Sequence, residues 1–295
     1  MARVHPSSIV DRHAELADDV SVGPFCHVHA GVRIGAGTRL VSHVVVMGST
    51  TLGVANVIHP FTVLGGEAQV RKGSDGGARP EQAGLEHAPR LESETVDVGV
   101  LAARRLEIGD HNVFRENVTA NASSGTGVTR IGSHNLFMAG CHVAHDVVVG
   151  SRCVVANGVQ LAGHVEVEDW VTFGGLAGVA QHLRVGQGAF VAAGAMCERD
   201  VPPFVIAQGD RARVRALNVV GLERRGVPAL SISALRKAFA ALWGSAARAS
   251  GDLAPSFDDV VRGLDRSDAW VAILAGWFDD PVRRIRPTKR SGSTV

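Results

Sequence analysis

The amino-acid sequence predicts a mainly β protein, a parallel β-helix that is followed by a C-terminal α-helical domain. Aliphatic residues recur every six positions through the first two thirds of the chain, and glycine supplies 35 of the 295 residues. Near residue 200 this repeat gives way to helical spacing. We expect the β-helix to span residues 1–203 with an inserted loop at 66–105. The helical domain would span 204–295 and end in a disordered tail at 283–295.

The six-residue repeat occurs in two long registers. The first consists of Val10, Leu16, Val22, Val28, Ile34, Leu40, Val46, Leu52, Ile58 and Leu64. The second consists of Ile131, Phe137, Val143, Val149, Val155, Leu161, Val167, Phe173, Val179, Val185, Val191 and Cys197. A short run of Ile108, Phe114 and Ala120 lies between them. Hydrophobic residues make up 45% of the chain, so such unbroken runs would hardly ever arise by chance.

A period of six does not fit an α-helix, in which apolar residues recur at three and four positions. It fits short strands joined by tight turns, with three strands to each coil and the aliphatic side chains stacked inside. One coil cannot bury its apolar face alone, so many coils are needed. Glycine often follows the repeat residue, as at Gly23 and Gly35, and we interpret these glycines as turn residues with positive φ.

The register breaks twice. Leu64 and Ile108 are 44 residues apart, and Ala120 and Ile131 are 11 apart, so neither spacing is a multiple of six. Both stretches therefore read as loops that leave the coil. Loops on a rigid scaffold commonly carry binding groups, although the longer loop could equally be an insertion without function.

The repeat ends at Pro202 and Pro203, because consecutive prolines cannot continue a strand ladder. Apolar spacing of three and four residues then predicts helices over 217–225, 231–247, 257–264 and 269–278. These helices could cover the end of the β-helix or form a subunit contact. We interpret the basic C-terminal end as a solvated tail, with an anionic partner as the alternative.

Composition excludes several classes of protein. Lys and Arg total 30 and Asp and Glu total 29, a net charge of +1, which argues against a protein that wraps nucleic acid. The chain has no apolar run long enough for an integral membrane segment, and its polar beginning does not resemble a signal peptide. The four cysteines form no CxxC pair, which favours reduced thiols and a cytoplasmic location.

One pair of segments carries candidate chemistry. The first contains His142, His145 and Asp146, and the second contains Gly163 and His164. Since a coil has eighteen residues, His145 and His164 should lie on adjacent coils, displaced by one position. We expect His145 to face outward near a corner, where an acidic neighbour would make it a general base. The Gly163 N–H could then stabilise a developing oxyanion.

Two other interpretations of these histidines stay open. Histidines on the turns of a β-helix are commonly inert surface residues. Three histidines could also hold a metal, but that requires a convergence that spacing alone does not reveal. Our prediction is a site without a metal.

Several longer sequence segments resemble those of a known family. They are VGPFC (22–26), SHVVVMG (42–48), CHVAHD (141–146), LAGHV (161–165), DVPPFVIAQGD (200–210) and NVVGLERRG (218–226). With these strings the chain resembles the hexapeptide-repeat acyltransferases, and among them the UDP-N-acetylglucosamine 3-O-acyltransferase family of lipid A synthesis. The similarity covers roughly residues 4–65 and 106–245.

The resemblance implies a left-handed β-helix that forms a homotrimer, with active sites between neighbouring subunits. It implies transfer of a 3-hydroxyacyl chain from acyl carrier protein to the sugar 3-OH of the nucleotide-sugar substrate, with no bound cofactor. His145 would be the general base, Asp146 the residue that orients it, and Gly163 the oxyanion donor.

The resemblance also implies binding roles. The residues matching sugar or acyl contacts are His142, His164 and Gln181. Those matching contacts to the diphosphate or the phosphopantetheine arm are Asn218, Arg224 and Arg225. Phe190 and Ala193 occupy the stretch that limits the acyl chain, and Ala193 in place of glycine predicts a somewhat shorter chain.

Three departures from the family pattern leave other functions open. Ala180 replaces a histidine, Val220 replaces an acidic residue, and the insertion offers only Lys72 and Asp75 as loose equivalents of a sugar-binding Lys and Asp. One alternative is an acyltransferase of the same fold acting on another nucleotide (amino) sugar. Others are a non-catalytic trimeric binding protein and, more remotely, a metal-dependent lyase.

Overall fold

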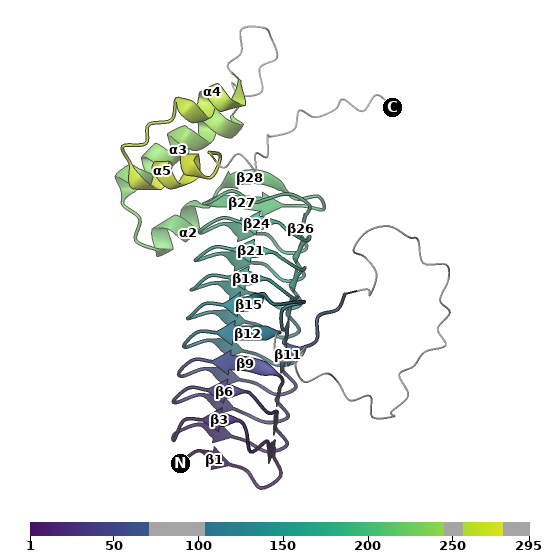
Figure 1. Ribbon diagram of the computed structural model, residues 1–295. Coiled ribbons are helices and arrows are strands. Elements are labelled where there is room, and N and C mark those ends of the chain that lie inside the picture. Colours follow the sequence, from purple (N-terminus) through teal and green to yellow (C-terminus); the bar gives the residue numbers. More distant parts are fainter. Residues whose placement is uncertain (71–103, 245–255, 280–295) are drawn as a thin grey trace, which may run out of the picture.

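The computed structural model describes residues 1–70, 104–244 and 256–279. Figure 1 shows a column of stacked coils, with the N-terminus at its base and a group of helices beside its upper end. The column is a left-handed parallel β-helix, which confirms the predicted fold class.

The column has three sheets, here named A, B and C, whose strands pair in parallel except for β28 at the end of sheet A. Sheet A contains β1 (Arg3–Val4), β4 (Ser21–Val22), β7 (Arg39–Leu40), β10 (Val57–Ile58), β13 (Val113–Phe114), β16 (Leu136–Phe137), β19 (Val154–Val155), β22 (Thr172–Phe173), β25 (Phe190–Val191), β27 (Val205–Gln208) and β28 (Arg213–Leu217). Sheet B contains β2 (Ile9–Val10), β5 (His27–Val28), β8 (Val45–Val46), β11 (Val63–Gly66), β14 (Thr119–Asn121), β17 (His142–Val143), β20 (Gln160–Leu161), β23 (Gly178–Val179) and β26 (Met196–Cys197). Sheet C contains β3 (Glu15–Leu16), β6 (Arg33–Ile34), β9 (Ser49–Leu52), β12 (Arg105–Ile108), β15 (Val128–Ile131), β18 (Val148–Val149), β21 (Glu166–Val167) and β24 (Arg184–Val185).

The repeat residue points into the column. In most coils each strand has two residues, and the second is the residue of the six-residue repeat; Val28, Leu40 and Val46 are fully buried in this way. Val10 and Leu16 are only partly buried, because the first coil has no coil beneath it. Further up, the rings of Phe114 and Phe137 stack inside the column, 4.9 Å apart and 3° from parallel.

The glycines that follow the repeat residue have a different cause from the one we predicted. Gly23 and Gly35 do not have positive φ; the left-handed positions come two residues later, as at Phe25 (φ 58°) and Gly37 (φ 68°). A Cβ on Gly35 would instead lie 2.7 Å from the backbone of Gly53 on the next coil. These glycines are therefore required by the close approach of stacked coils.

A polar ladder inside the corner between sheets C and A holds the coils in register. Asn56, Asn112 and Asn135 are buried, and each offers its side-chain oxygen to a backbone N–H of the next coil; Asn112 N donates to Asn56 Oδ1 over 2.8 Å. The partners in this ladder lie 56, 23 and then 18 residues apart. The extra residues are thus looped out without disturbing the stack.

Both loops leave the column at the corner between sheets B and C, here named the B–C corner. The first departs after β11 and returns at β12, and the second joins β14 to β15. Of the longer loop, residues 66–70 and 104–105 lie within the described chain and the remainder lies outside it.

The strand ladder extends beyond the expected end at residue 203. After the two prolines, β27 continues sheet A and β28 turns back to pair with it in antiparallel fashion, so strand structure runs to Leu217. The prolines occupy the corner before β27 and interrupt none of its pairing. The helices then follow as predicted: α2 (Val219–Arg224), α3 (Ala229–Trp243), α4 (Phe257–Arg262) and α5 (Ala269–Gly276). The predicted tail at 283–295 lies outside the described residues.

Two general expectations can be compared with the fold. Among the residues that the structure describes, none of the helices combines the length and the apolar character needed to cross a bilayer. All four cysteines are buried free thiols, and burial raises the pKa of Cys153 and Cys197 to about 12. These thiols are therefore poor nucleophiles.

The stacked phenylalanines provide a test of the core. Replacing Phe137 with Ala leaves a cavity between coils that cannot collapse, so the free energy of unfolding should fall by about 3–5 kcal/mol. Denaturant unfolding at fixed protein concentration measures this loss. The control is Leu230→Ala, at a side chain that is 86% exposed; an equal loss in both variants would contradict the assignment.

Candidate active site

A groove of about 450 Å³ runs along the outer face of sheet B. Its lining begins at β17 and continues over β20 and β23 to β26, so it climbs four coils. The lining residues are Gln69, His142, Ala144, His145, Gln160, Leu161, Ala162, Gly163, Gly178, Val179, Ala180, Gln181, Met196, Cys197 and Glu198. We call it the His145 groove.

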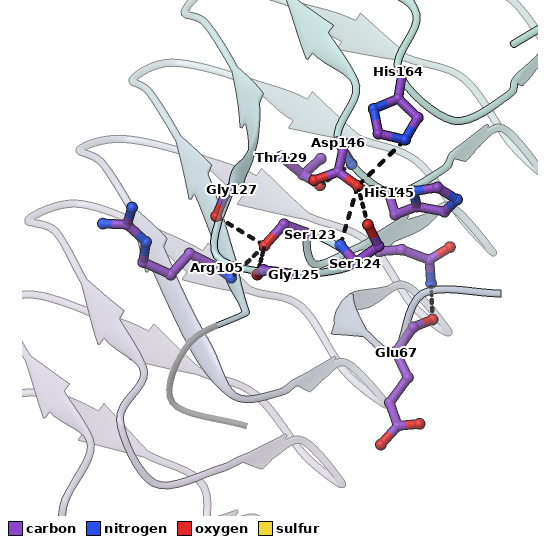
Figure 2. A network of polar contacts seen from close by, with 11 residues as sticks. Glu67, Arg105, Ser123, Ser124, Gly125, Gly127, Thr129, His145, Asp146 and His164 are labelled. Atoms are coloured by element: carbon purple, nitrogen blue, oxygen red, sulfur yellow. Dashed lines mark hydrogen bonds and ion pairs between the residues drawn. The ribbon is translucent and has the colours of Figure 1, made fainter. Parts of the chain in front are cut away.

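His145 and Asp146 form a hydrogen-bonded pair at the B–C corner. His145 Nδ1 lies 2.9 Å from Asp146 Oδ2 (Figure 2). Both side chains are largely buried. Asp146 has φ 60°, the left-handed conformation that aspartate tolerates better than most residues, and its N–H donates to Thr129 Oγ1 over 2.7 Å. With Nδ1 held by the carboxylate, Nε2 of His145 is the nitrogen left for a reacting group.

Asp146 is held in its ionised form. Burial acts to raise the pKa of this carboxyl, but hydrogen bonds from the Ser124 hydroxyl, the His145 ring and the Ser124 N–H outweigh burial and lower the pKa below its usual 3.8. Asp146 therefore remains a carboxylate throughout the neutral range and can stabilise a protonated His145.

Gly163 lies directly above the His145 ring. A Cβ on Gly163 would come within 2.6 Å of His145 Cε1 and 2.8 Å of Nε2, so only glycine fits here. Within the residues that the structure describes, the Gly163 N–H donates no hydrogen bond. Gly163 therefore has a free N–H donor and packs against the ring of the candidate base.

The other histidines of the site are arranged as the coil predicts. His164 follows one coil after Asp146, with Nε2 3.8 Å from Asp146 Oδ2, and its ring stacks on His182 at 4.6 Å. This geometry confirms that His145 and His164 lie on adjacent coils, displaced by one position. His142 contacts Thr119 Oγ1 through Nδ1 at 2.7 Å, and its pKa is lowered by burial and by nearby His145.

The groove includes some expected binding residues and omits others. Gln181 lines it, as does Ala180, where the family has a histidine. Phe190 lies on β25 in sheet A and Ala193 is exposed at the next corner; neither lines the His145 groove. The upper end of the groove is formed instead by Met196, which is 43% exposed. Lys72 and Asp75 lie outside the described residues.

The three residues matched to phosphate contacts lie on or beside α2 and do not line the His145 groove. Asn218 is the N-cap of α2: its side chain accepts from Gly221 N and donates to the Gly188 carbonyl. Arg224 is exposed in the last turn. Of the two arginines, Arg224 is therefore the one that is open to solvent.

Arg225 is packed against aromatic rings. Its guanidinium carbon lies 5.1 Å from the Trp170 ring and 5.0 Å from the Trp270 ring, in space that any side chain at Gly188 would fill. Burial lowers the pKa of this guanidinium, against the opposing charge of Asp169. Because Trp170 belongs to the column and Trp270 to α5, Arg225 joins the helical domain to the β-helix.

Three residues at the same corner could together coordinate a metal ion. The donor atoms of His145, Asp146 and His164 all lie within 4.8 Å of one another. Neutral imidazole and carboxylate are suitable ligands for zinc. In the present geometry, however, the shortest of these contacts is the hydrogen bond that holds the His145–Asp146 pair.

Sequence reasoning missed the groups that surround this pair. Ser124 and Thr129 contact Asp146 from the coil below, and Met196 closes the groove from above. The signal for the first two was present, because both belong to the second break in the register. Their contacts require the loop conformation, which the repeat does not specify.

These features define a hexapeptide-repeat acyltransferase fold with a histidine–aspartate pair in a groove. The bacterial transferase hexapeptide model matches residues 129–163, the segment that contains the pair. The second-domain model of the UDP-N-acetylglucosamine O-acyltransferases matches residues 200–255.

Whole-chain relatives identify the family. A protein of Thiobacillus denitrificans named acyl-(acyl-carrier-protein)–UDP-N-acetylglucosamine O-acyltransferase is 41% identical over 260 residues, covering 86% of this chain and 91% of the relative. The UDP-N-acetylglucosamine O-acyltransferase of Moraxella catarrhalis superposes with a TM-score of 0.77 at 32% identity, covering 94% of this chain and 96% of that one. The Francisella novicida acyltransferase gives 0.78 at 26% identity, with 95% and 92% covered. The chain belongs to the UDP-N-acetylglucosamine O-acyltransferase family.

The packing of Arg225 can be tested against exposed Arg224. Arg225→Ala removes a cation–π contact to two tryptophans and should lower the free energy of unfolding by about 2 kcal/mol. Hydrogen exchange over 219–224 should become faster in this variant, whereas Arg224→Ala should leave both quantities unchanged. Equal protection of α2 in the two variants would count against the proposed contact.

Proposed function

We propose that this protein transfers a 3-hydroxyacyl chain from acyl carrier protein to the 3-OH of UDP-N-acetylglucosamine, the first step of lipid A synthesis. The observation that carries the proposal is the His145–Asp146 pair, with a free Gly163 N–H beside the ring in an extended groove. Membership of the family, in which the Thiobacillus relative bears this activity in its name, supplies the substrates.

The proposed chemistry needs a base and an oxyanion donor. His145 Nε2 removes the proton from the sugar 3-OH, and the oxygen attacks the thioester carbonyl carbon. The Gly163 N–H donates to the oxyanion of the tetrahedral intermediate. The C–S bond then breaks, the ester forms, and the carrier's thiolate takes the proton from His145. Asp146 stabilises the imidazolium throughout and keeps its carboxylate ionised.

We further propose a cytoplasmic homotrimer, with each groove completed by a neighbouring subunit. An exposed row of rings at the corner between sheets A and B supports a subunit contact: Phe25 and Phe61 are 60% and 57% exposed, and both pack against His43 with tilted rings. The α2 residues lie outside the groove of their own subunit. A neighbour's Arg224 could therefore bind the diphosphate.

A second candidate is transfer to another nucleotide sugar, such as one with an amino group at the reacting carbon. The reason is Ala180, which lines the groove where the family has a histidine. Comparing UDP-N-acetylglucosamine with its 3-amino analogue as acceptor, each with the same acyl carrier protein thioester, decides between them. Ester formation supports the first proposal, and exclusive amide formation supports the second.

The role of His145 leads to a direct prediction. His145→Ala should lower kcat on the order of 10² to 10⁴-fold, because the general base is lost. Asp146, whose pKa is lowered by its hydrogen bonds, stays ionised at neutral pH, so its charge is the same in both proteins under the assay conditions. Thioester consumption measures the rate.

A matched control exists on the same column. His13 pairs with Asp11 over 3.0 Å at an exposed corner far below the groove. His13→Ala should therefore retain full activity. If His145→Ala turns over as fast as His13→Ala, His145 is not the base.

Removal of metal distinguishes the general-base proposal from a metal site. Under the general-base proposal, prolonged treatment with EDTA followed by desalting should leave kcat unchanged, since the proposed steps need only protein groups. Added Zn²⁺ should not increase the rate. Loss of activity on chelation with recovery on adding one equivalent of Zn²⁺ would instead support a metal at His145, Asp146 and His164.

A further inference from the structure

The second break in the repeat, between β14 and β15, forms a small loop against the carboxylate of Asp146. Ser124 contacts that carboxylate twice: its hydroxyl donates to Oδ2 over 2.6 Å, and its backbone N–H donates to the same oxygen over 3.1 Å (Figure 2). A hydroxyl at this distance from a carboxylate is a strong, charge-assisted donor.

Hydrogen bonds within the loop fix the position of Ser124. The neighbouring Ser123 is fully buried, and its hydroxyl donates to the carbonyls of Gly127 and Gly125 over 2.9 and 3.1 Å. The Arg105 N–H in turn donates to Ser123 Oγ over 3.1 Å. A Cβ on Gly127 would approach Asp146 Oδ1 within 3.1 Å, so glycine leaves room for the second carboxylate oxygen. The loop thus encloses the carboxylate from below.

Asp146 has two histidines within reach. Its Oδ2 is 2.9 Å from Nδ1 of His145 and 3.8 Å from Nε2 of His164 on the coil above. Without another anchor, a rotation of the side chain could exchange one partner for the other. The Ser124 hydroxyl, from the coil below, donates to Oδ2, the same oxygen that makes the short contact with His145.

We propose that Ser124 is a positioning residue: its hydroxyl holds Asp146 against His145 and away from His164, so that the base keeps its orienting carboxylate. The proposal rests on the proposed function, in which His145 removes the substrate proton. Ser124 itself touches no reacting atom in this scheme.

Within the described residues, further titratable groups near the pair bear on what a pH profile can report. His142 lies on β17 beside His145, His182 stacks on His164, and Glu198 lies at the far end of the groove. None of these groups is hydrogen-bonded to Ser124. A change caused by the Ser124 hydroxyl should therefore act through Asp146.

The test compares Ser124→Ala, Ser124→Thr and the matched control Thr126→Ala, an exposed hydroxyl of the same loop. Ser124→Ala should lower kcat about 10-fold, the order expected for losing a hydrogen bond to a charged group. KM should stay within about twofold for both substrates, and the acid limb of the kcat profile should move to lower pH. Ser124→Thr keeps the hydroxyl and should restore most of the rate, and Thr126→Ala should match the unchanged protein.

A second measurement does not depend on turnover. Diethyl pyrocarbonate modifies neutral imidazole, so its rate at each histidine, mapped by mass spectrometry across pH, reports which ring the carboxylate stabilises. In Ser124→Ala the midpoint for His145 should fall and that for His164 should rise. A merely structural role of Ser124 would not move the two midpoints in opposite directions.

The outcomes separate the two proposals. An unchanged rate and unchanged midpoints in Ser124→Ala overturn the positioning role, and so does a Ser124→Thr variant as impaired as Ser124→Ala. If the unchanged protein transfers no acyl group to any acceptor, the proposed function fails. The opposite movement of the two midpoints would then still support Ser124 as the anchor of Asp146.

Discussion

Everything in this molecule depends on the stacking of one eighteen-residue coil on the next. Backbone N–H groups of each coil donate to carbonyls of the coil above, as from His27 N to Val44 O over 2.8 Å, so equivalent residues lie one above another. The inner positions must then be apolar or carry a small polar side chain that is hydrogen-bonded within the stack, and the row of stacked glycines must stay free of side chains. Chemical variety is left to the corners, where side chains point outward and the backbone can adopt positive φ.

The site lies on two adjacent vertical rows of residues at one such corner. One row contains Asp146, His164 and His182, and the other contains His145 and Gly163. Vertical stacking places Gly163 against the His145 ring, and the neighbouring row supplies the carboxylate of Asp146. A single repeated geometry thus brings together groups that other folds collect from distant segments. It also explains why a spacing of eighteen or nineteen residues was informative in the sequence.

The sequence allowed the repeat, the four helices and the His145–Asp146–Gly163 cluster to be predicted, because each follows from a period or a short string. It did not reveal the cause of the glycines after the repeat residue, which lies in contacts between coils eighteen residues apart. Nor did it indicate that β27 and β28 extend sheet A, because that pairing follows two prolines. The packing of Arg225 between tryptophans of two domains, and the contact of Ser124 with Asp146, depend on tertiary placement that no local pattern encodes.

The asparagine ladder at the corner between sheets C and A bears on how such a protein can change over evolution. It keeps the same hydrogen bonds whether its partners are 18, 23 or 56 residues apart. The entropy of closing a flexible loop rises only with the logarithm of length, by about 0.6 kcal/mol for each doubling. Segments can therefore be gained or lost at the B–C corner, beside the groove, with little effect on the rest of the column. Substrate preference and scaffold stability can consequently evolve almost independently in this chain.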